Sequence, residues 1–149
     1  MKVRFRKATE ADLPAAVALM TDDILGQGRD GADFGIYVEA FRAMAAEPCN
    51  FLIVGETATV DVVAVYQFTL MTGIAQKGLR RAQIEAIRVA SDLRGKGIGK
   101  MLMDDAEDRA RSAGARLLQL TTNRERDRTH AFYRRQGYVD THLGFKKPL

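Results

Sequence analysis

Arg94-Gly95-Lys96-Gly97-Ile98-Gly99 joins a predicted strand to a predicted helix. The apolar, β-prone residues 84–89 upstream predict the strand, and apolar residues every four positions from Ile98 to Ala110 predict the helix. The glycines at 95, 97 and 99 permit positive φ, so that successive N–H groups can point into one concavity at the start of the helix. Orphan donors and the helix dipole favour an anion there, and Arg94, Lys96 and Lys100 add positive charge. The stretch therefore predicts a cradle for a pyrophosphate.

The spacing of these glycines separates the cradle from two common phosphate-binding loops. The stretch is not a Walker A loop. That motif needs a glycine five positions before Gly99, where Arg94 stands, and a Ser or Thr after Lys100, where Met101 stands. The dinucleotide fingerprint fails because Lys100 occupies the place of its third glycine. The remaining pattern, R-G-x-G-x-G after a strand, resembles the acetyl-CoA-binding motif of the GNAT superfamily of acyl-CoA N-acyltransferases. A purely structural glycine turn is the alternative.

Length and composition predict one globular domain over residues 1–149. The chain has 149 residues, of which 46% are hydrophobic and 28% charged, enough for a real core. No apolar stretch approaches the ~20 residues of a membrane span, and Met1 leads into charged sequence rather than a signal peptide. The single Cys49 excludes an internal disulfide, and Cys49, His130 and His142 form no recognisable metal set. We therefore expect a soluble, cytoplasmic protein without a metal.

The net charge of +4 is unevenly distributed. Residues 1–75 hold 6 Lys/Arg against 10 Asp/Glu, whereas residues 76–149 hold 17 against 9. The basic half contains the glycine stretch, so a polyanionic cofactor explains the asymmetry. Nucleic acid is a weaker explanation, because aromatic and basic residues are not interleaved.

The order of predicted elements favours an α/β (α+β) fold. The patterns predict strands at 3–6, 51–54, 60–70, 84–89, 116–122, 138–139 and 143–145, and helices over 13–20, 34–45, 98–113 and 129–136. Thr9 and Asp12 approximate a capping box, Gly55 opens a hairpin turn, and Gly114 and Gly137 end helices. Residues 26–33 read as a turn-rich loop and residues 73–81 as a basic connection. This order implies a mixed sheet with helices on both faces.

The resemblance to GNAT proteins extends over essentially the whole chain. Residues 1–20, 83–102 and 118–138 resemble the family's first strand and helix, its central acetyl-CoA segment and its later segment, in the family's order. The resemblance implies a mostly antiparallel, twisted sheet of about seven strands with about four helices. It also implies an acetyl-CoA-dependent N-acetyltransferase in which a primary amine, from a small molecule, amino acid or protein, attacks directly in a ternary complex. Residues 26–33 and the second helix match only loosely, so the acceptor is not carried over.

The family assigns roles to particular residues. The main chain of Ile87, Arg88 and Val89 would pair with the pantetheine arm, like an added strand. Asn123 would hydrogen-bond that arm, and Tyr133 would protonate the departing thiolate. The backbone around the glycine stretch would hold the pyrophosphate, through Arg94, Gly95, Lys96, Gly97, Ile98, Gly99 and Lys100.

Glu85 is the predicted general base, because the family often keeps a carboxylate on the central strand near the acceptor amine. A partly desolvated carboxylate there could act directly or through water. Alternatively, Glu85 is an exposed strand residue paired with Arg4 or Arg88, and the base is another carboxylate such as Asp33 or Glu39.

Two other function classes stay open. A non-catalytic acyl-CoA-binding or regulatory module could use the same fold, and an RNA- or ribosome-associated module could use the basic half. Tyr133 could equally be a core aromatic beside Phe132. A homodimer is compatible with the sequence.

Overall fold

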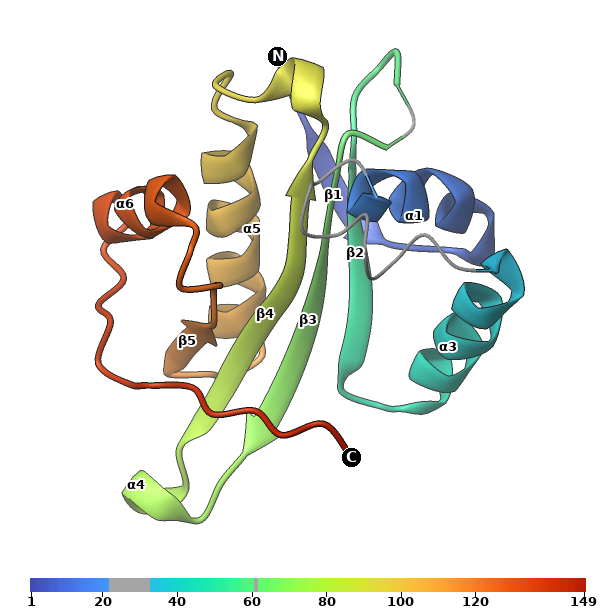
Figure 1. Cartoon of the computed structure of the whole chain (residues 1–149). Coiled ribbons are helices and arrows are strands. Elements are labelled where there is room, and N and C mark those ends of the chain that lie inside the picture. Colours follow the sequence, from blue (N-terminus) through green and yellow to red (C-terminus); the bar gives the residue numbers. More distant parts are fainter. Residues whose placement is uncertain (22–32, 61) are drawn as a thin grey trace. The chain divides into compact units, whose positions relative to one another are not determined.

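The structure is a computed structural model that describes residues 1–21, 33–60 and 62–149 (Figure 1). Met1–Gln119 forms one compact unit and Leu120–Leu149 forms a second. The loop expected at 26–33 lies outside the described residues, except for Asp33. Whether the two units make a single domain stays a prediction.

The described strands form one mixed sheet in the order β1-β2-β3-β4-β5. Its three interfaces from β1 to β4 are antiparallel. Arg116 N–H donates to Arg80 O at 2.9 Å, and Gln119 Nε2 donates to Gln83 Oε1 at 2.8 Å. The residue numbers increase in the same direction on both strands, so β5 runs parallel to β4. The strands are β1 (Arg4–Lys7), β2 (Asn50–Glu56), β3 (Ala64–Thr72), β4 (Arg80–Val89) and β5 (Leu117–Leu120).

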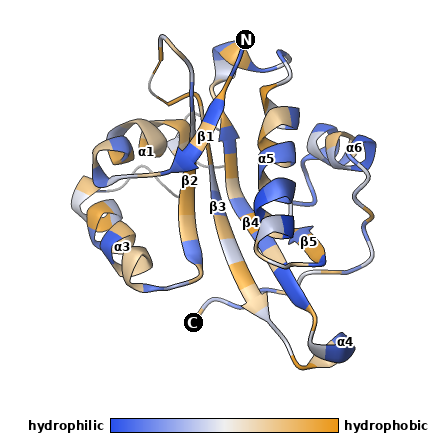
Figure 2. Cartoon of the chain, turned by 180° about the vertical axis from the view of Figure 1, so that it is seen from behind, coloured by the Kyte–Doolittle hydropathy of each residue, from blue (hydrophilic) through white to orange (hydrophobic). Residues whose placement is uncertain are grey.

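Helices cover both faces of this sheet, as predicted (Figure 1). On one face, Leu13 and Ala16 of α1 pack with Leu52, Val54 and Val65, and α3 adds partly buried side chains. On the other face, α5 packs against β3 and β4 through a buried stripe, and Figure 2 shows many hydrophilic residues elsewhere on this helix. The helices are η1 (Glu10–Asp12), α1 (Leu13–Thr21), α3 (Phe34–Ala46), α4 (Ala75–Gly78), η2 (Ser91–Leu93), α5 (Ile98–Ser112) and, in the second unit, α6 (Asp127–Arg135).

The predicted hairpin between β2 and β3 has a different turn from the one expected. β3 begins at Ala64 rather than at position 60, because Thr57 N–H donates to Val60 O and closes a turn after β2. Gly55 lies inside β2, opposite Phe5, and does not open the turn. A Cβ at Gly55 would lie 2.7 Å from Phe5 Cε1. Close packing against β1, and not turn geometry, therefore requires this glycine.

The two short strands predicted at 138–139 and 143–145 do not form in the described second unit, so the sheet has five strands instead of about seven. The side chains of Val139, Leu143 and Phe145 are 76%, 73% and 91% exposed. Segments of two or three residues gain few ladder hydrogen bonds, and here they have no apolar surface to cover.

Both glycines predicted to end helices do so. Gly114 has φ +78° and Gly137 has φ +88°, the left-handed conformation that glycine favours. After α5, Gly114 N–H donates to Arg111 O and Ala115 N–H donates to Ala110 O, which together make a Schellman motif. The last helix starts earlier than predicted, at Asp127 instead of position 129.

A buried ion-pair network ties β1 to η1 and β2. Arg6 donates to both oxygens of Asp12, at 2.7 and 2.9 Å, and through Nε to Glu56 Oε2 at 2.8 Å. Thr9 N–H donates to Asp12 Oδ2 at 2.7 Å, as expected for the capping pair. The Arg6 hydrogen bonds, helped by Thr9 and opposed by burial, lower the pKa of the Asp12 carboxyl from 3.8 to about 2.

We expect Asp12→Asn to lower the free energy of unfolding by about 2 kcal/mol at pH 7. Because the folded pKa lies below the unfolded one, the charge stabilises the fold above about pH 4. That contribution is lost as pH falls through about 2. Urea unfolding at pH 7 and near pH 2 measures the difference. An equal effect of the substitution at both pH values would contradict the assignment.

Candidate functional site

A β-bulge interrupts β4 beside the predicted catalytic residue. Gln67 on β3 faces Glu85, but Val65 faces Arg88, so β4 advances three residues while β3 advances two. Ala86 carries the bulge with φ +52°. A left-handed non-glycine residue costs roughly 1–3 kcal/mol and persists only where its surroundings enforce it. The sequence offered no glycine at this position to indicate the bulge.

Tyr66, which lies opposite the bulge, is anchored from the other side of the sheet. It is completely buried, and its hydroxyl donates to Asp105 Oδ2 of α5 at 2.5 Å. Asp105 also accepts from Arg109 Nε at 2.7 Å, and Arg109 Nη2 reaches Phe5 O at 3.2 Å. Burial raises the pKa of the Tyr66 hydroxyl, and the Asp105 carboxylate raises it further, so Tyr66 stays a neutral donor. This network holds β1, β3 and α5 together at the level of the bulge.

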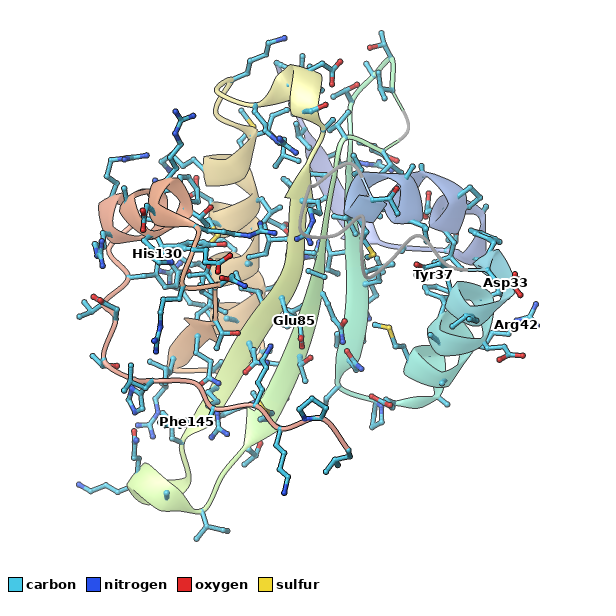
Figure 3. The ribbon with its side chains drawn as sticks, viewed as in Figure 1. Asp33, Tyr37, Arg42, Glu85, His130 and Phe145 are labelled. Atoms are coloured by element: carbon cyan, nitrogen blue, oxygen red, sulfur yellow. The ribbon has the colours of Figure 1, made fainter. Side chains whose placement is uncertain are left out.

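Glu85 projects from the middle of β4, immediately before the bulge (Figure 3). It makes no hydrogen bond or ion pair with the residues that the structure describes. The alternative partner Arg4 binds Glu56 instead, at 2.8 Å. The expected partial desolvation is not found, because the side chain is exposed. Glu85 therefore forms no ion pair with the described residues. The packing of the strands does not require a charged residue at this position.

The predicted pantetheine-binding residues lie just beyond the bulge. Arg88 and Val89 pair with β3 on one side. On the other side, the β5 contacts fall at Arg80 and Gln83, and the four residues of β5 are too few to pair with residues 87–89. Arg88 Nη1 donates to the Ile87 carbonyl at 2.9 Å, which leaves that oxygen one further lone pair for a ligand.

The glycine stretch forms the predicted strand-to-helix connection, with η2 inserted between β4 and the turn. Gly95 and Gly97 are left-handed, with φ +76° and +83°, and Gly97 is the N-cap of α5. Gly99 lies inside α5 without positive φ, so only two of the three glycines are needed for the turn. Within the described structure, no N–H from position 95 to 100 donates a backbone hydrogen bond. These donors are the expected means of holding an anion.

The cations around the turn are not equally available. Lys100 Nζ binds Asp104 at 2.7 Å along α5, in an exposed ion pair between residues one turn apart. Arg94 Nε donates to Val89 O at 3.3 Å. Lys96 is exposed and forms no ion pair with the residues that the structure describes.

The second unit holds Asn123 and Tyr133 on α6 and the turn before it. Asn123 Oδ1 accepts from Glu125 N–H at 2.9 Å, and its main-chain oxygen accepts from His130 Nε2 at 2.8 Å. Tyr133 is buried, with ring centroids 5.4 Å from Phe132 and 6.1 Å from Tyr138. The local hydrogen bonds of Asn123, including the contact with His130 of α6, were not predicted from sequence, because the residue types alone do not indicate their partners.

A cavity of about 260 Å³ lies on the opposite face of the sheet from Glu85. Its walls include Phe68 and Leu70, which alternate along β3 with the Glu85-facing Gln67 and Thr69. The cavity therefore does not belong to the candidate site. Its lining residues are Lys7, Phe51, Ile53, Phe68, Leu70, Arg109, Ser112 and Ala113.

The described residues contain no group of three or more His, Cys, Asp or Glu side chains that could hold a metal ion. None of their helices has the length and apolar character needed to cross a membrane.

Comparison with known proteins agrees with the resemblance found in the sequence. The model of the Acetyltransferase (GNAT) family matches residues 20–138. The aminoalkylphosphonate N-acetyltransferase of Salmonella typhimurium is 43% identical over 67 residues, which cover 45% of this chain and 44% of that protein. The streptothricin acetyltransferase of Streptomyces lavendulae is 34% identical over 127 residues, covering 85% and 58%. The chain thus spans about half the length of these curated relatives.

A solved structure is similar over the full length of the chain. It is described as a transcriptional regulator from Bacillus halodurans C-125. The two share 35% identity and superpose with a TM-score of 0.93, covering 99% of this chain and 100% of the other. The expected fold class is confirmed by this similarity.

We expect Gly97→Val to weaken acetyl-CoA binding at least about tenfold, or ~1.4 kcal/mol. A β-branched residue disfavours the left-handed backbone that aims the loop N–H groups. Gly114→Val is the matched control, because Gly114 is also left-handed with no atom within 4 Å of a Cβ, yet it lies at the other end of α5. Both variants should lose similar stability, and titration calorimetry should show weaker binding for Gly97→Val alone. Equal affinity in the two variants would remove the loop from the cofactor site.

Proposed function

Because the chain belongs to the GNAT acetyltransferase family, we propose that it transfers the acetyl group of acetyl-CoA to the nitrogen of a primary amine. The observation that supports this most directly is Glu85. It is a carboxylate that forms no ion pair with the described residues, and it lies on β4 beside a bulge, just before the edge at 87–89. The curated relatives are named an N-acetyltransferase and an acetyltransferase, which supports the reaction class.

Acetyl-CoA would lie along the second half of β4. The orphan N–H groups from position 95 to 100 and the start of α5 fit a pyrophosphate, and Lys96 adds an unpaired positive charge. The edge of Ile87 and Val89 would pair with the amide groups of the pantetheine arm. When bound there, acetyl-CoA supplies the activated acetyl group.

Glu85 would accept the proton that the acceptor brings. A free alkylammonium has a pKa near ~10, so it arrives protonated at neutral pH and must lose a proton before its nitrogen can attack. The nitrogen would then bond to the acetyl carbon as the carbon–sulfur bond breaks, and Tyr133 would donate its phenolic proton to the departing sulfur. The second nitrogen proton, released as the amide forms, would return to Tyr133 through water. Backbone N–H groups at the bulge would stabilise negative charge on the acetyl oxygen.

The acceptor is proposed to be a small molecule that carries a cationic primary amino group. The curated relatives are named for aminoalkylphosphonate and streptothricin, and the acidic balance of residues 1–75 favours a cation. A thiol-release assay with acetyl-CoA across a panel of such amines tests the function. Release with at least one amine is expected.

A second candidate function is a regulatory module that binds acyl-CoA without transferring the acyl group. The full-length similarity to a protein described as a transcriptional regulator favours it. Acetyl-CoA binding without thiol release for any amine in the panel would support this alternative and contradict the transferase.

Glu85→Gln keeps shape and hydrogen bonding but removes the base. We expect kcat/KM to fall by about 10²-fold with little change in acetyl-CoA affinity, and the acidic limb of the pH–rate profile to disappear or shift. That limb arises because a carboxylate base is lost by protonation as pH falls. Glu39→Gln, on α3, is the control and should retain the wild-type profile. A wild-type rate and limb in Glu85→Gln would place the base elsewhere.

Tyr133→Phe keeps the ring contacts with Phe132 and Tyr138 and removes only the proton donor. The acetyl-transfer rate should drop by about 10²-fold while acetyl-CoA affinity barely changes. Tyr138→Phe, the neighbouring ring, should stay near the wild-type rate. Single-turnover measurements that show no loss in Tyr133→Phe would return this residue to the core-aromatic interpretation.

A further inference from the structure

A strip of polar side chains crosses four strands on the face where α1 and α3 pack. Cross-strand partners point to the same face of a sheet, and Gln67 faces Glu85 while Thr69 lies between Asn50 and Gln83. Gln119 joins through its hydrogen bond to Gln83. The polar strip consists of Asn50, Gln67, Thr69, Gln83, Glu85 and Gln119, and Glu85 is its only charged member.

A chain of hydrogen bonds determines which way the side-chain amides of Asn50 and Gln67 are turned. Glu47, just after α3, can only accept, so Asn50 must turn Nδ2 towards it, at 2.7 Å. Asn50 Oδ1 is then the acceptor for Gln67 Nε2, at 2.8 Å, and for Thr69 Oγ1, at 3.4 Å. The carboxylate of Glu47 therefore determines the orientation of Gln67 two hydrogen bonds away.

This orientation leaves Gln67 with an unused acceptor next to Glu85. Its Nε2 is committed to Asn50, and its Oε1 accepts no hydrogen bond from the described residues. Glu85 lies directly across the strand pair, within the ~5 Å that separates such Cβ atoms. The site thus offers two acceptor groups side by side, one charged and one neutral. A ligand that satisfies both must carry at least two N–H or O–H donors on one small group.

We propose that Gln67 and Glu85 together recognise a primary amino group, and that Glu47 and Asn50 are positioning residues for Gln67. This inference rests on the proposed function and names the chemistry of its acceptor. A primary ammonium gives one proton to Glu85 and still has an N–H for Gln67 Oε1. A hydroxyl that gives its single proton to Glu85 leaves Gln67 Oε1 unpaired. The pair therefore selects amines over alcohols of the same shape.

Equilibrium binding tests the selection without requiring catalysis. The probes are 2-aminoethylphosphonate and 2-hydroxyethylphosphonate, which differ only in the amino or hydroxyl group, titrated calorimetrically into the full chain. The wild type should bind the amine at least about tenfold more tightly, since a hydrogen bond to a charged group has this worth. Gln67→Met should reduce that preference several-fold, although the ammonium keeps its ion pair with Glu85. Gln83→Met is the matched control: its Oε1 is already occupied by Gln119, so the preference should persist.

The chain of hydrogen bonds from Glu47 through Asn50 to Gln67 is tested by exchanging its donors and acceptors. In Glu47→Lys, the new ammonium requires Asn50 to offer Oδ1, so Gln67 must turn Nε2 towards Glu85, and the amine preference should fall as in Gln67→Met. Adding Asn50→Asp to Glu47→Lys restores an acceptor for Gln67 Nε2 and should restore the preference to within about threefold of wild type. A merely structural role for Glu47 predicts no such rescue.

The outcomes separate this inference from the proposed function. No amine preference in the wild type, an unchanged preference in Gln67→Met, or no rescue by Asn50→Asp would each overturn the inference. If the preference and its losses appear but no amine releases thiol from acetyl-CoA, the amine site stands and the acetyl-transfer function fails.

Discussion

The left-handed backbone at Ala86 is the constraint around which the candidate site is arranged. A strand that gains one residue changes the face to which its later side chains point. Before the bulge, Glu85 shares a face with Gln67; after it, the strand continues in a new register towards the glycine turn. Ala86 has no intrinsic preference for this conformation. The buried Tyr66–Asp105–Arg109 network, at the same level of the sheet, is the rigid support against which the strain persists.

Charges in this protein fall into two groups with different consequences. Arg6, Asp12 and Glu56 satisfy one another in a partly buried network and so contribute to stability. Asp105 and Arg109 do the same beneath the sheet. Glu85 and the donors of the glycine turn are left without such partners among the described residues. The proposed function uses these groups, Glu85 for the acceptor and the N–H donors of the glycine turn for the pyrophosphate.

The cofactor end of the proposed site depends less on particular side chains than the acceptor end does. The glycine turn depends on backbone conformation and orphan N–H groups, so many side chains are compatible with it. The polar strip depends on the side chains of β2, β3 and β4 and on the direction of each amide. In the proposed site, substitutions on the polar strip would change the choice of acceptor while the cofactor end is kept. The different acceptors in the relatives' names fit this division of roles.

Local patterns in the sequence were enough to predict the element order, the glycine turn, the Thr9–Asp12 capping pair and the helix ends at Gly114 and Gly137, because each depends on residues a few positions apart. The hypothesis that Glu85 is the base came instead from the resemblance to the GNAT family, which often keeps a carboxylate on that strand. The local patterns did not indicate the bulge at Ala86, the packing reason for Gly55, the missing last strands or the pairing of Gln67 with Glu85. Those features depend on which strands lie side by side and in what register, and side chains distant in the chain determine that only once the sheet has formed.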